Sequence, residues 1–286
     1  MNVVALGGGH GTSVTLSALN RLNVDFAGVV SVADDGGSTG VLRELLGIAG
    51  VGDLRKCLAV LAANAEQWAP LLEFRFEDDE LGHHALGNLL LAASIASSNN
   101  LEESIQKVSE LLAIRGRLLP ASSEAVELEA DTDDGVIRGQ VAIARETGVS
   151  NLRTVPESVA APRSVIEAIE QADFVLIGPG SLITSVIAAC VVPGIREALK
   201  RTSATKIWLA NLKTEYPETS GWSVRKQLQA LQDHGILLDL VLLDERHHGI
   251  EGTLDVAVES FDLASGGASI HDPAKLSRAL EQVMAN

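Results

Sequence analysis

Short apolar runs alternate along this chain with longer stretches in which apolar residues recur at helical spacing. The first run, at residues 3–6, ends in a glycine-rich segment at 7–13, and a helical pattern follows from Val14 to Leu22. This order predicts a buried strand, a tight turn and an amphipathic helix. Similar apolar runs predict strands at residues 24–32, 174–177, 207–210 and 238–243. Because strands alternate with helices, the predicted fold class is α/β with a mostly parallel sheet.

Residues 41–115 show almost only helical periodicity. We interpret this segment as a helical insertion after the second strand, within one α/β domain that spans residues 1–286. Asp53 is expected to cap one of its helices. Farther along, apolar residues alternate with glutamates before the turn sequence at 131–135, which predicts a hairpin over 126–139. We expect this hairpin either at the edge of the sheet or over the ligand site.

Glycine-rich or polar segments follow four of the predicted strands, at 7–13, 33–40, 178–181 and Asn211. The carboxyl ends of parallel strands meet at one edge of a sheet, where ligands bind. Glycines let the backbone approach a ligand, and the free N–H groups of a helix's first turn bind anions, at roughly 1.5–3 kcal/mol per charged hydrogen bond. The alternative is that the glycines only allow strands and helices to pack closely.

The first of these segments matches neither common phosphate-binding motif in full. Thr12 stands where the third glycine of G-x-G-x-x-G would be, and no Lys-Ser or Lys-Thr pair completes a Walker loop. The convergence of several such segments nevertheless favours a nucleotide site. We expect the following residues to bind the nucleotide or its phosphates: Gly8, Gly9, His10, Gly11, Thr12, Asp34, Gly36, Gly37, Ser38, Arg55, Asn88, Gly178, Pro179, Gly180, Ser181 and Asn211.

Several of these side chains allow more than one role. An acid at the end of a second strand, such as Asp34, can bond ribose hydroxyls, whereas paired carboxylates near phosphates can hold Mg²⁺. Asp35, which two glycines follow, is the expected metal ligand, and a turn or capping role is the alternative for Asp34. His10 can donate to a phosphate, transfer a proton or only fill space. Arg55 can hold a phosphate or pair with an acidic residue, and the same holds for Arg43.

Composition narrows the classes of partner. The net charge of −16 argues against sequence-independent binding to nucleic acid or to anionic membranes. The apolar segment at 182–192 is too short to span a bilayer, so no membrane insertion is expected. Cys57 and Cys190 lie in apolar helical patterns without metal-ligand spacing, as in a cytoplasmic protein with reduced thiols. No order of Ser, His and Asp indicates a nucleophilic triad, so catalytic residues are not assigned.

A series of motifs occurs in order over roughly the first three quarters of the chain. It comprises Gly7-Gly8-Gly9-x-Gly11, Ala33-Asp34-Asp35-Gly36-Gly37-Ser38-x-Gly40, Gly52-Asp53-Leu54-Arg55, Phe74-Arg75-Phe76, Gly82-His83, Gly87-Asn88-Leu89-Leu90 and Ile177-Gly178-Pro179-Gly180-Ser181-Leu182. This series resembles the YvcK-like gluconeogenesis factors, within the wider superfamily of CofD-like 2-phospholactate transferases. His10 departs from the threonine usual in the first motif. The part after about Asp244 is short and matches poorly.

The resemblance implies a Rossmann-like three-layer α/β/α fold and a bacterial cytoplasmic protein. It also implies binding of a nucleotide sugar of the UDP-N-acetylglucosamine type and a role in cell shape and carbon metabolism. The transferase branch uses a guanosine diphosphate donor and Mg²⁺, held by an aspartate whose position matches Asp35. If this chain is an enzyme, the resemblance implies a transferase of that type.

Three hypotheses therefore remain open for the function. The first is a nucleotide-sugar-binding protein without robust turnover, whose partner is a small-molecule nucleotide. The second is an Mg²⁺-dependent 2-phospholactate transferase. The third is an NAD-binding oxidoreductase, which an acid such as Asp34 at the end of the second strand would suit. The helical insertion or an exposed sheet edge offers a surface for a homodimer.

Overall fold

The computed structural model describes residues 1–77, 82–246, 254–266 and 269–285. Its main sheet has seven described strands in the order β10-β9-β8-β7-β1-β2-β3, and all neighbouring pairs are parallel. The strands are β1 (Asn2–Gly7), β2 (Asp25–Val30), β3 (Arg117–Pro120), β7 (Phe174–Ile177), β8 (Thr205–Leu209), β9 (Leu240–Asp244) and β10 (Ala257–Phe261). The order reverses between β1 and β7, which lie side by side at the centre.

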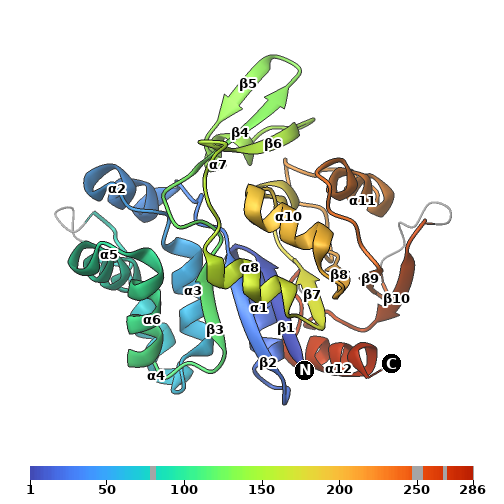
Figure 1. Ribbon diagram of the computed structural model, residues 1–286, viewed down its shortest axis with the longest axis horizontal. Coiled ribbons are helices and arrows are strands. Elements are labelled where there is room, and N and C mark those ends of the chain that lie inside the picture. The colour runs from blue at the N-terminus through green and yellow to red at the C-terminus, as the bar shows by residue number, and fades with distance from the viewer. Residues whose placement is uncertain (78–81, 247–253, 267–268, 286) are drawn as a thin grey trace.

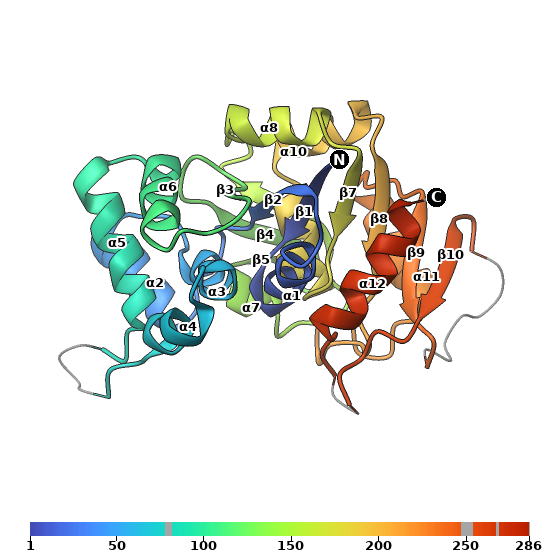
Figure 2. The same cartoon turned by 90° about the horizontal axis from the view of Figure 1, so that it is seen from below.

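Helices cover both faces of this sheet and complete a three-layer α/β/α fold, as Figure 2 shows. On one face lie α8 (Arg163–Glu170) and α10 (Pro193–Arg201), and on the other lie α1 (Gly9–Leu19) and α12 (Pro273–Met284). The predicted α/β class with a mostly parallel sheet is therefore confirmed. The interior is filled by Val, Leu, Ile and Ala, and Trp208 is the largest fully buried side chain.

Five described helices follow β2 and precede β3, on the left of the sheet in Figure 1. They are α2 (Gly37–Leu46), α3 (Gly52–Leu61), α4 (Ala65–Glu73), α5 (Leu86–Ser98) and α6 (Leu101–Leu111). The helical pattern expected for 41–115 thus corresponds to real helices. The sequence reading overlooked β3, because a four-residue edge strand shows no clear alternation.

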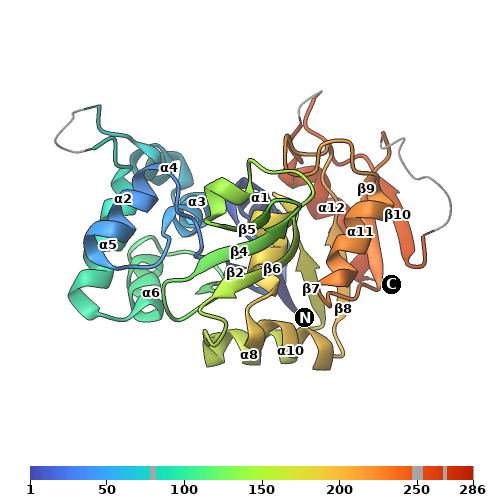
Figure 3. The same cartoon turned by 90° about the horizontal axis from the view of Figure 1, so that it is seen from above.

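Several further elements lie outside the main layers or interrupt a helix. The predicted hairpin forms as β4 (Glu127–Thr132) and β5 (Gly135–Arg138), and β6 (Ser150–Val155) pairs with β4 to make a separate antiparallel sheet. Figures 1 and 3 show this small sheet above the main one. The apolar segment after β7 begins as the π-helix η1 (Leu182–Ile187) and continues as α9 (Ala188–Cys190). The remaining helices are α7 (Gln140–Ile143) and α11 (Val224–Asp233).

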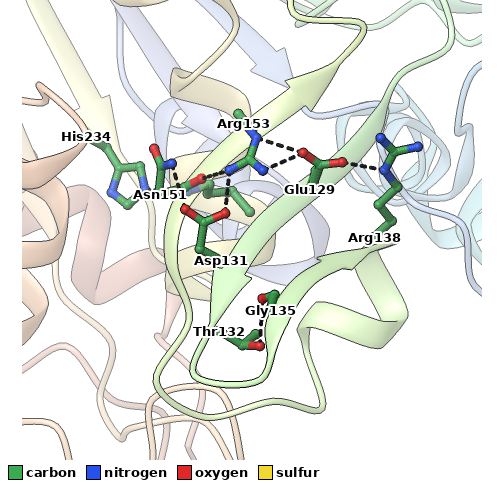
Figure 4. Close-up of polar contacts among 9 residues, drawn as sticks. Glu129, Asp131, Thr132, Gly135, Arg138, Asn151, Arg153 and His234 are labelled. Carbon is green, nitrogen blue, oxygen red and sulfur yellow. Dashed lines mark hydrogen bonds and ion pairs between the residues drawn. The ribbon is translucent and has the colours of Figure 1, made fainter.

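Charged side chains fix the register of the small sheet, as Figure 4 shows. Arg153 of β6 binds both Glu129 and Asp131 of β4, and Asp131 also accepts a hydrogen bond from Asn151 at 2.9 Å. Arg138 of β5 pairs with Glu129 from the other side. The sequence reading overlooked β6 because these polar residues make the segment look like a loop.

Both cysteines are fully buried free thiols. Burial raises the pKa of each thiol, that of Cys190 to about 12, so both stay protonated near neutral pH.

Within the described residues, no single helix has both the length and the apolar character that a membrane crossing requires. The pair Leu182–Cys190 and Pro193–Arg201, bent by 73°, meets that test only when its two helices are taken together.

Candidate functional site

A cleft opens at the carboxyl ends of β1, β7 and β8, next to the point where the strand order reverses. One part of it, which we call the polar half, has a volume of about 330 Å³ and is lined by Gly8, Asp34, Asp53, Lys56, Ser181 and Glu215, among others. The adjoining part, the apolar half, has a volume of about 270 Å³ and includes Val14, Pro179, Leu212 and Ile270. His10, Gly11, Gly180 and Glu215 line both halves, so the two form one continuous cleft.

The glycine segments after β1 and β7 touch each other at the middle of this cleft. A Cβ atom on Gly11 would lie 2.0 Å from the backbone oxygen of Pro179 and 2.7 Å from the nitrogen of Gly180. Only glycine allows so close an approach at this position. Gly8 is similarly close to another wall of the cleft, because a Cβ there would lie 2.6 Å from Asp53 Oδ2.

Asn211, just after β8, fixes the segment that follows β7. Its Oδ1 accepts a hydrogen bond from the Gly180 nitrogen at 2.9 Å, and its Nδ2 donates to the Gly180 oxygen at 2.7 Å. Gly180 has a φ of +139°, a backbone conformation that residues other than glycine rarely adopt. A single amide side chain therefore holds an otherwise permissive backbone in one position.

A buried carboxylate holds the next turn of the same segment. Glu218 is 2 % exposed, and its Oε2 accepts a hydrogen bond from Ser181 Oγ at 2.6 Å. Its Oε1 accepts from the Thr184 backbone nitrogen at 2.8 Å. Glu215, three residues earlier, lines the cleft, and burial raises the pKa of its carboxyl, with a further upward contribution from Glu218.

The two adjacent aspartates after β2 have different surroundings. Asp34 lines the polar half, and its Oδ1 accepts a hydrogen bond from the Gly36 nitrogen at 3.0 Å. Burial, and then the charge of Asp53, raise the pKa of Asp34. Asp35 instead accepts hydrogen bonds from the nitrogens of Gln140 and Val141 at 2.8 and 2.9 Å. Its carboxylate thus caps α7 and ties the small sheet to the main one.

Asp53 and Lys56 form a charged pair on the wall of the polar half. Lys56 Nζ donates to Asp53 Oδ1 at 2.9 Å. The expectation that Asp53 caps its helix is wrong, since α3 begins at Gly52, Val51 occupies the cap position and no side chain caps it. Asp53 was missed as a cleft residue because only the packing of α3 against α1 brings it beside Gly8.

Other expected site residues form a buried polar cluster behind the cleft. Ser38 Oγ lies 2.9 Å from His84 Nδ1 and accepts a hydrogen bond from Asn88 Nδ2 at 3.0 Å. Arg55 is 3 % exposed and approaches the Glu73 carboxylate to 2.9 Å. Burial lowers the pKa of Arg55. Among the described residues, Asn88 Oδ1 and Arg55 Nε have no hydrogen-bond partner.

The expected residues therefore divide into two groups. Those that line the cleft are Gly8, Gly9, His10, Gly11, Asp34, Pro179, Gly180, Ser181 and Asn211. Those that do not line it are Thr12, Asp35, Gly36, Gly37, Ser38, Arg55, Asn88 and Gly178. Thr12 lies beneath the first loop, where a Cβ on Gly7 would be 2.4 Å from its Oγ1. Cleft residues outside the expected set include Asp53, Lys56, Gln140, Thr184, Ser185 and Glu215.

The described residues contain no group of three or more His, Cys, Asp or Glu side chains that could hold a metal ion. Mg²⁺ commonly uses only one or two carboxylates together with water and phosphate oxygens. Asp34 and Asp53 are suitably placed for that, because both line the polar half and interact electrostatically. Asp35 fits less well, since both of its carboxylate oxygens already accept backbone hydrogen bonds.

The fold and cleft define a Rossmann-like α/β protein with a cleft at the topological switch point, where proteins of this class bind their ligands. Its sequence matches the family described as 2-phospho-L-lactate transferase CofD over residues 3–263. The chain belongs to this family, and its curated relatives carry the name gluconeogenesis factor.

Two of those relatives come from distant bacteria. The chain is 38% identical to a putative gluconeogenesis factor of Mycobacterium leprae, over 99% of this chain and 86% of that protein. It is also 38% identical to the gluconeogenesis factor of Halalkalibacterium halodurans, over 85% of this chain and 78% of that protein.

A solved structure has the same fold. The crystal structure of a UPF0052-family protein from Bacillus halodurans matches with a TM-score of 0.91 and 33% identity, and the match covers 98% of both chains.

Proposed function

We propose that this protein binds a nucleotide sugar of the UDP-N-acetylglucosamine type across the polar and apolar halves of its cleft, and acts as a gluconeogenesis factor. The observation that carries the proposal is the contact of Gly11 with Pro179 and Gly180. This contact brings two glycine segments, from opposite sides of the switch point, to one place where backbone N–H groups can meet a diphosphate.

The chemistry of the two halves supports a ligand with two unlike ends. The apolar half, with Val14, Pro179 and Leu212, suits the flat face of a base. The polar half, with Asp34, Ser181 and Glu215, offers acceptors and donors to sugar hydroxyls. In this arrangement the diphosphate lies between them, beside His10 and Gly180, which line both halves. A role in carbon metabolism and cell shape, and a cytoplasmic location, follow from the resemblance to gluconeogenesis factors and belong to the same proposal.

A ligand panel tests this proposal. We expect UDP-N-acetylglucosamine to raise the melting temperature of the protein and to give a saturable heat of binding in calorimetry. Gly11→Ala should abolish both effects, because its Cβ would force the two glycine segments apart. Gly266→Ala is the matched control, since a Cβ there meets nothing within 4 Å. The proposal fails if neither this ligand nor any other uridine diphosphate sugar binds, or if NAD binds in their place.

A second candidate function is an Mg²⁺-dependent transferase of the 2-phospholactate type. It is favoured by the family match and by the two carboxylates, Asp34 and Asp53, that line the polar half. When bound there, Mg²⁺ would neutralise the charge of the donor's diphosphate and of the monophosphate that leaves. Asp34 and Asp53 would hold the ion, and Lys56 would keep Asp53 oriented. The resemblance gave the metal role to Asp35, and the contacts of Asp35 with α7 are the reason for preferring Asp34.

The two functions make different predictions. A transferase should release guanosine monophosphate from a donor in which 2-phospholactate is joined to it through a diphosphate bond, when Mg²⁺ and a deazaflavin acceptor are present, and Asp34→Asn should abolish the release. Asp35→Asn should reduce it less, through loss of the contact with α7. Nucleotide-sugar binding that is unaffected by Mg²⁺, together with no release from the donor, would favour the first function.

A further inference from the structure

Two nitrogen-bearing side chains, His10 and Lys56, face the polar half of the cleft from different helices. His10 belongs to the first turn of α1 and Lys56 to α3, which packs against α1. Lys56 is already paired with Asp53 at 2.9 Å. The imidazole of His10 has no hydrogen-bond partner among the described residues. The hydroxyl of Ser13 donates to the backbone oxygen of His10 and not to its ring. His10 therefore has an imidazole available to a ligand.

Charged groups surround His10 on several elements. From α3 come Lys56, Asp53 and Arg55, and from α4 comes Glu73. Burial, and then the positive charge of Lys56, lower the pKa of His10 below its usual value. The imidazole is thus neutral at neutral pH in the free protein.

Two more carboxyls line the same half of the cleft, Asp34 from the segment after β2 and Glu215 from the segment after β8. Because Asp53 balances the charge of Lys56, the free cleft has no excess of positive side-chain charge to attract a diphosphate.

We propose that His10 takes up a proton when a diphosphate diester binds beside it and Lys56, so that this chain holds its ligand more tightly as the pH falls. The inference rests on the nucleotide-sugar function proposed above. The diphosphate would lie where His10, Gly11 and Gly180 meet, since these residues line both halves of the cleft. His10 would then be the residue that makes binding sensitive to pH.

The direction of the effect follows from linkage between proton and ligand binding. The diester carries its two negative charges throughout the range tested, so the ligand itself does not titrate. Its charge raises the pKa of His10 in the complex above the value in the free protein. Between those two values the complex holds one more proton, and affinity rises as pH falls. A difference of one pKa unit corresponds to about a tenfold change in affinity.

Calorimetry with UDP-N-acetylglucosamine between pH 5.5 and 8 tests the inference. For the unmodified protein we expect binding roughly tenfold tighter at the lower pH. We also expect proton uptake on binding within this pH range, measured from the difference in heat between two buffers of unlike ionisation enthalpy. His10→Gln and His10→Thr should remove both the slope and the proton uptake while the protein remains folded, because the imidazole makes no hydrogen bond to the described residues.

Two sets of variants separate His10 from its neighbours. Asp34 and Glu215 have raised pKa values and also gain protons as the pH falls. If Asp34→Asn or Glu215→Gln removes the slope and His10→Gln keeps it, the inference is wrong. Lys56→Gln should move the slope to higher pH, because the charge that lowers the pKa of His10 is gone.

The failure of this inference is distinguishable from the failure of the proposed function. Binding of UDP-N-acetylglucosamine with the same affinity from pH 5.5 to 8 overturns the role of His10 and leaves the proposed function standing. No binding at any pH overturns the proposed function and this inference with it.

Discussion

Replacing Asn211 with aspartate tests whether one amide side chain holds the cleft in shape. The substitution keeps the size of the side chain and the acceptor for the Gly180 N–H. It replaces the Nδ2 donor, which lies 2.7 Å from the Gly180 oxygen, with a carboxylate oxygen. Two acceptors would then face each other at a distance suited to a hydrogen bond. We therefore expect the segment after β7 to move away from β8.

The size of the effect can be worked from these contacts. Loss of one hydrogen bond costs about 0.5–1.5 kcal/mol, and an acceptor left facing another acceptor adds to that. Because Asn211 and Gly180 are only half-buried, water relieves part of the second cost. We expect a total loss of about 1–2 kcal/mol in the free energy of unfolding. For a chain of this length that corresponds to a drop of roughly 2–8 °C in Tm.

Differential scanning calorimetry measures the Tm, and titration with UDP-N-acetylglucosamine measures the effect on the cleft. We expect affinity to fall by about tenfold, the equivalent of 1.4 kcal/mol. The matched control is Asn23→Asp, which adds the same charge at an exposed position between α1 and β2. If Asn211→Asp melts within about 1 °C of the control and binds the ligand equally well, Asn211 does not hold the cleft.

Three further predictions concern carboxylates that hold segments around the cleft. Asp35→Asn should expose the segment at 133–149 to limited proteolysis. Each carboxylate oxygen of Asp35 accepts one N–H group of α7, and in asparagine one of these acceptors becomes an NH₂ group that cannot accept. Glu218→Ala should lower the free energy of unfolding by about 2–3 kcal/mol in urea titrations, since it removes the acceptor of the buried Thr184 N–H and of the part-buried Ser181 hydroxyl. Glu197→Ala, at an exposed position, should change it little. Burial raises the pKa of Asp244, but hydrogen bonds from Arg246 and the Leu263 nitrogen outweigh it and lower the pKa to about 2. The ionised Asp244 should therefore contribute about 1–2 kcal/mol to the free energy of unfolding, after allowance for solvent screening. In urea titrations this contribution should be present above pH 4 and lost towards pH 2, and Asp244→Asn should not show the loss.

Local signals were sufficient for many elements of the fold. The strand at 174–177 was predicted with its observed bounds, because a buried parallel strand appears as an uninterrupted apolar run. Helix α6 begins after the capping side chain of Asn100 and α12 begins at Pro273, and both signals act within one turn. The edge strand β10 was missed because it is half-exposed and is defined by its pairing with β9.

The order of strands and glycine segments along the chain was enough to predict a parallel sheet with an anion site at the ends of its strands, because backbone geometry and strand polarity follow from local sequence. Which side chains face that site was decided only by tertiary contacts. Asp34 and Asp35 are equivalent in the sequence, yet backbone nitrogens 105 and 106 residues away take the carboxylate of Asp35 and leave Asp34 to the cleft. Asp53 and Lys56 reach the cleft because α3 packs against α1, a contact between distant segments that no local pattern encodes.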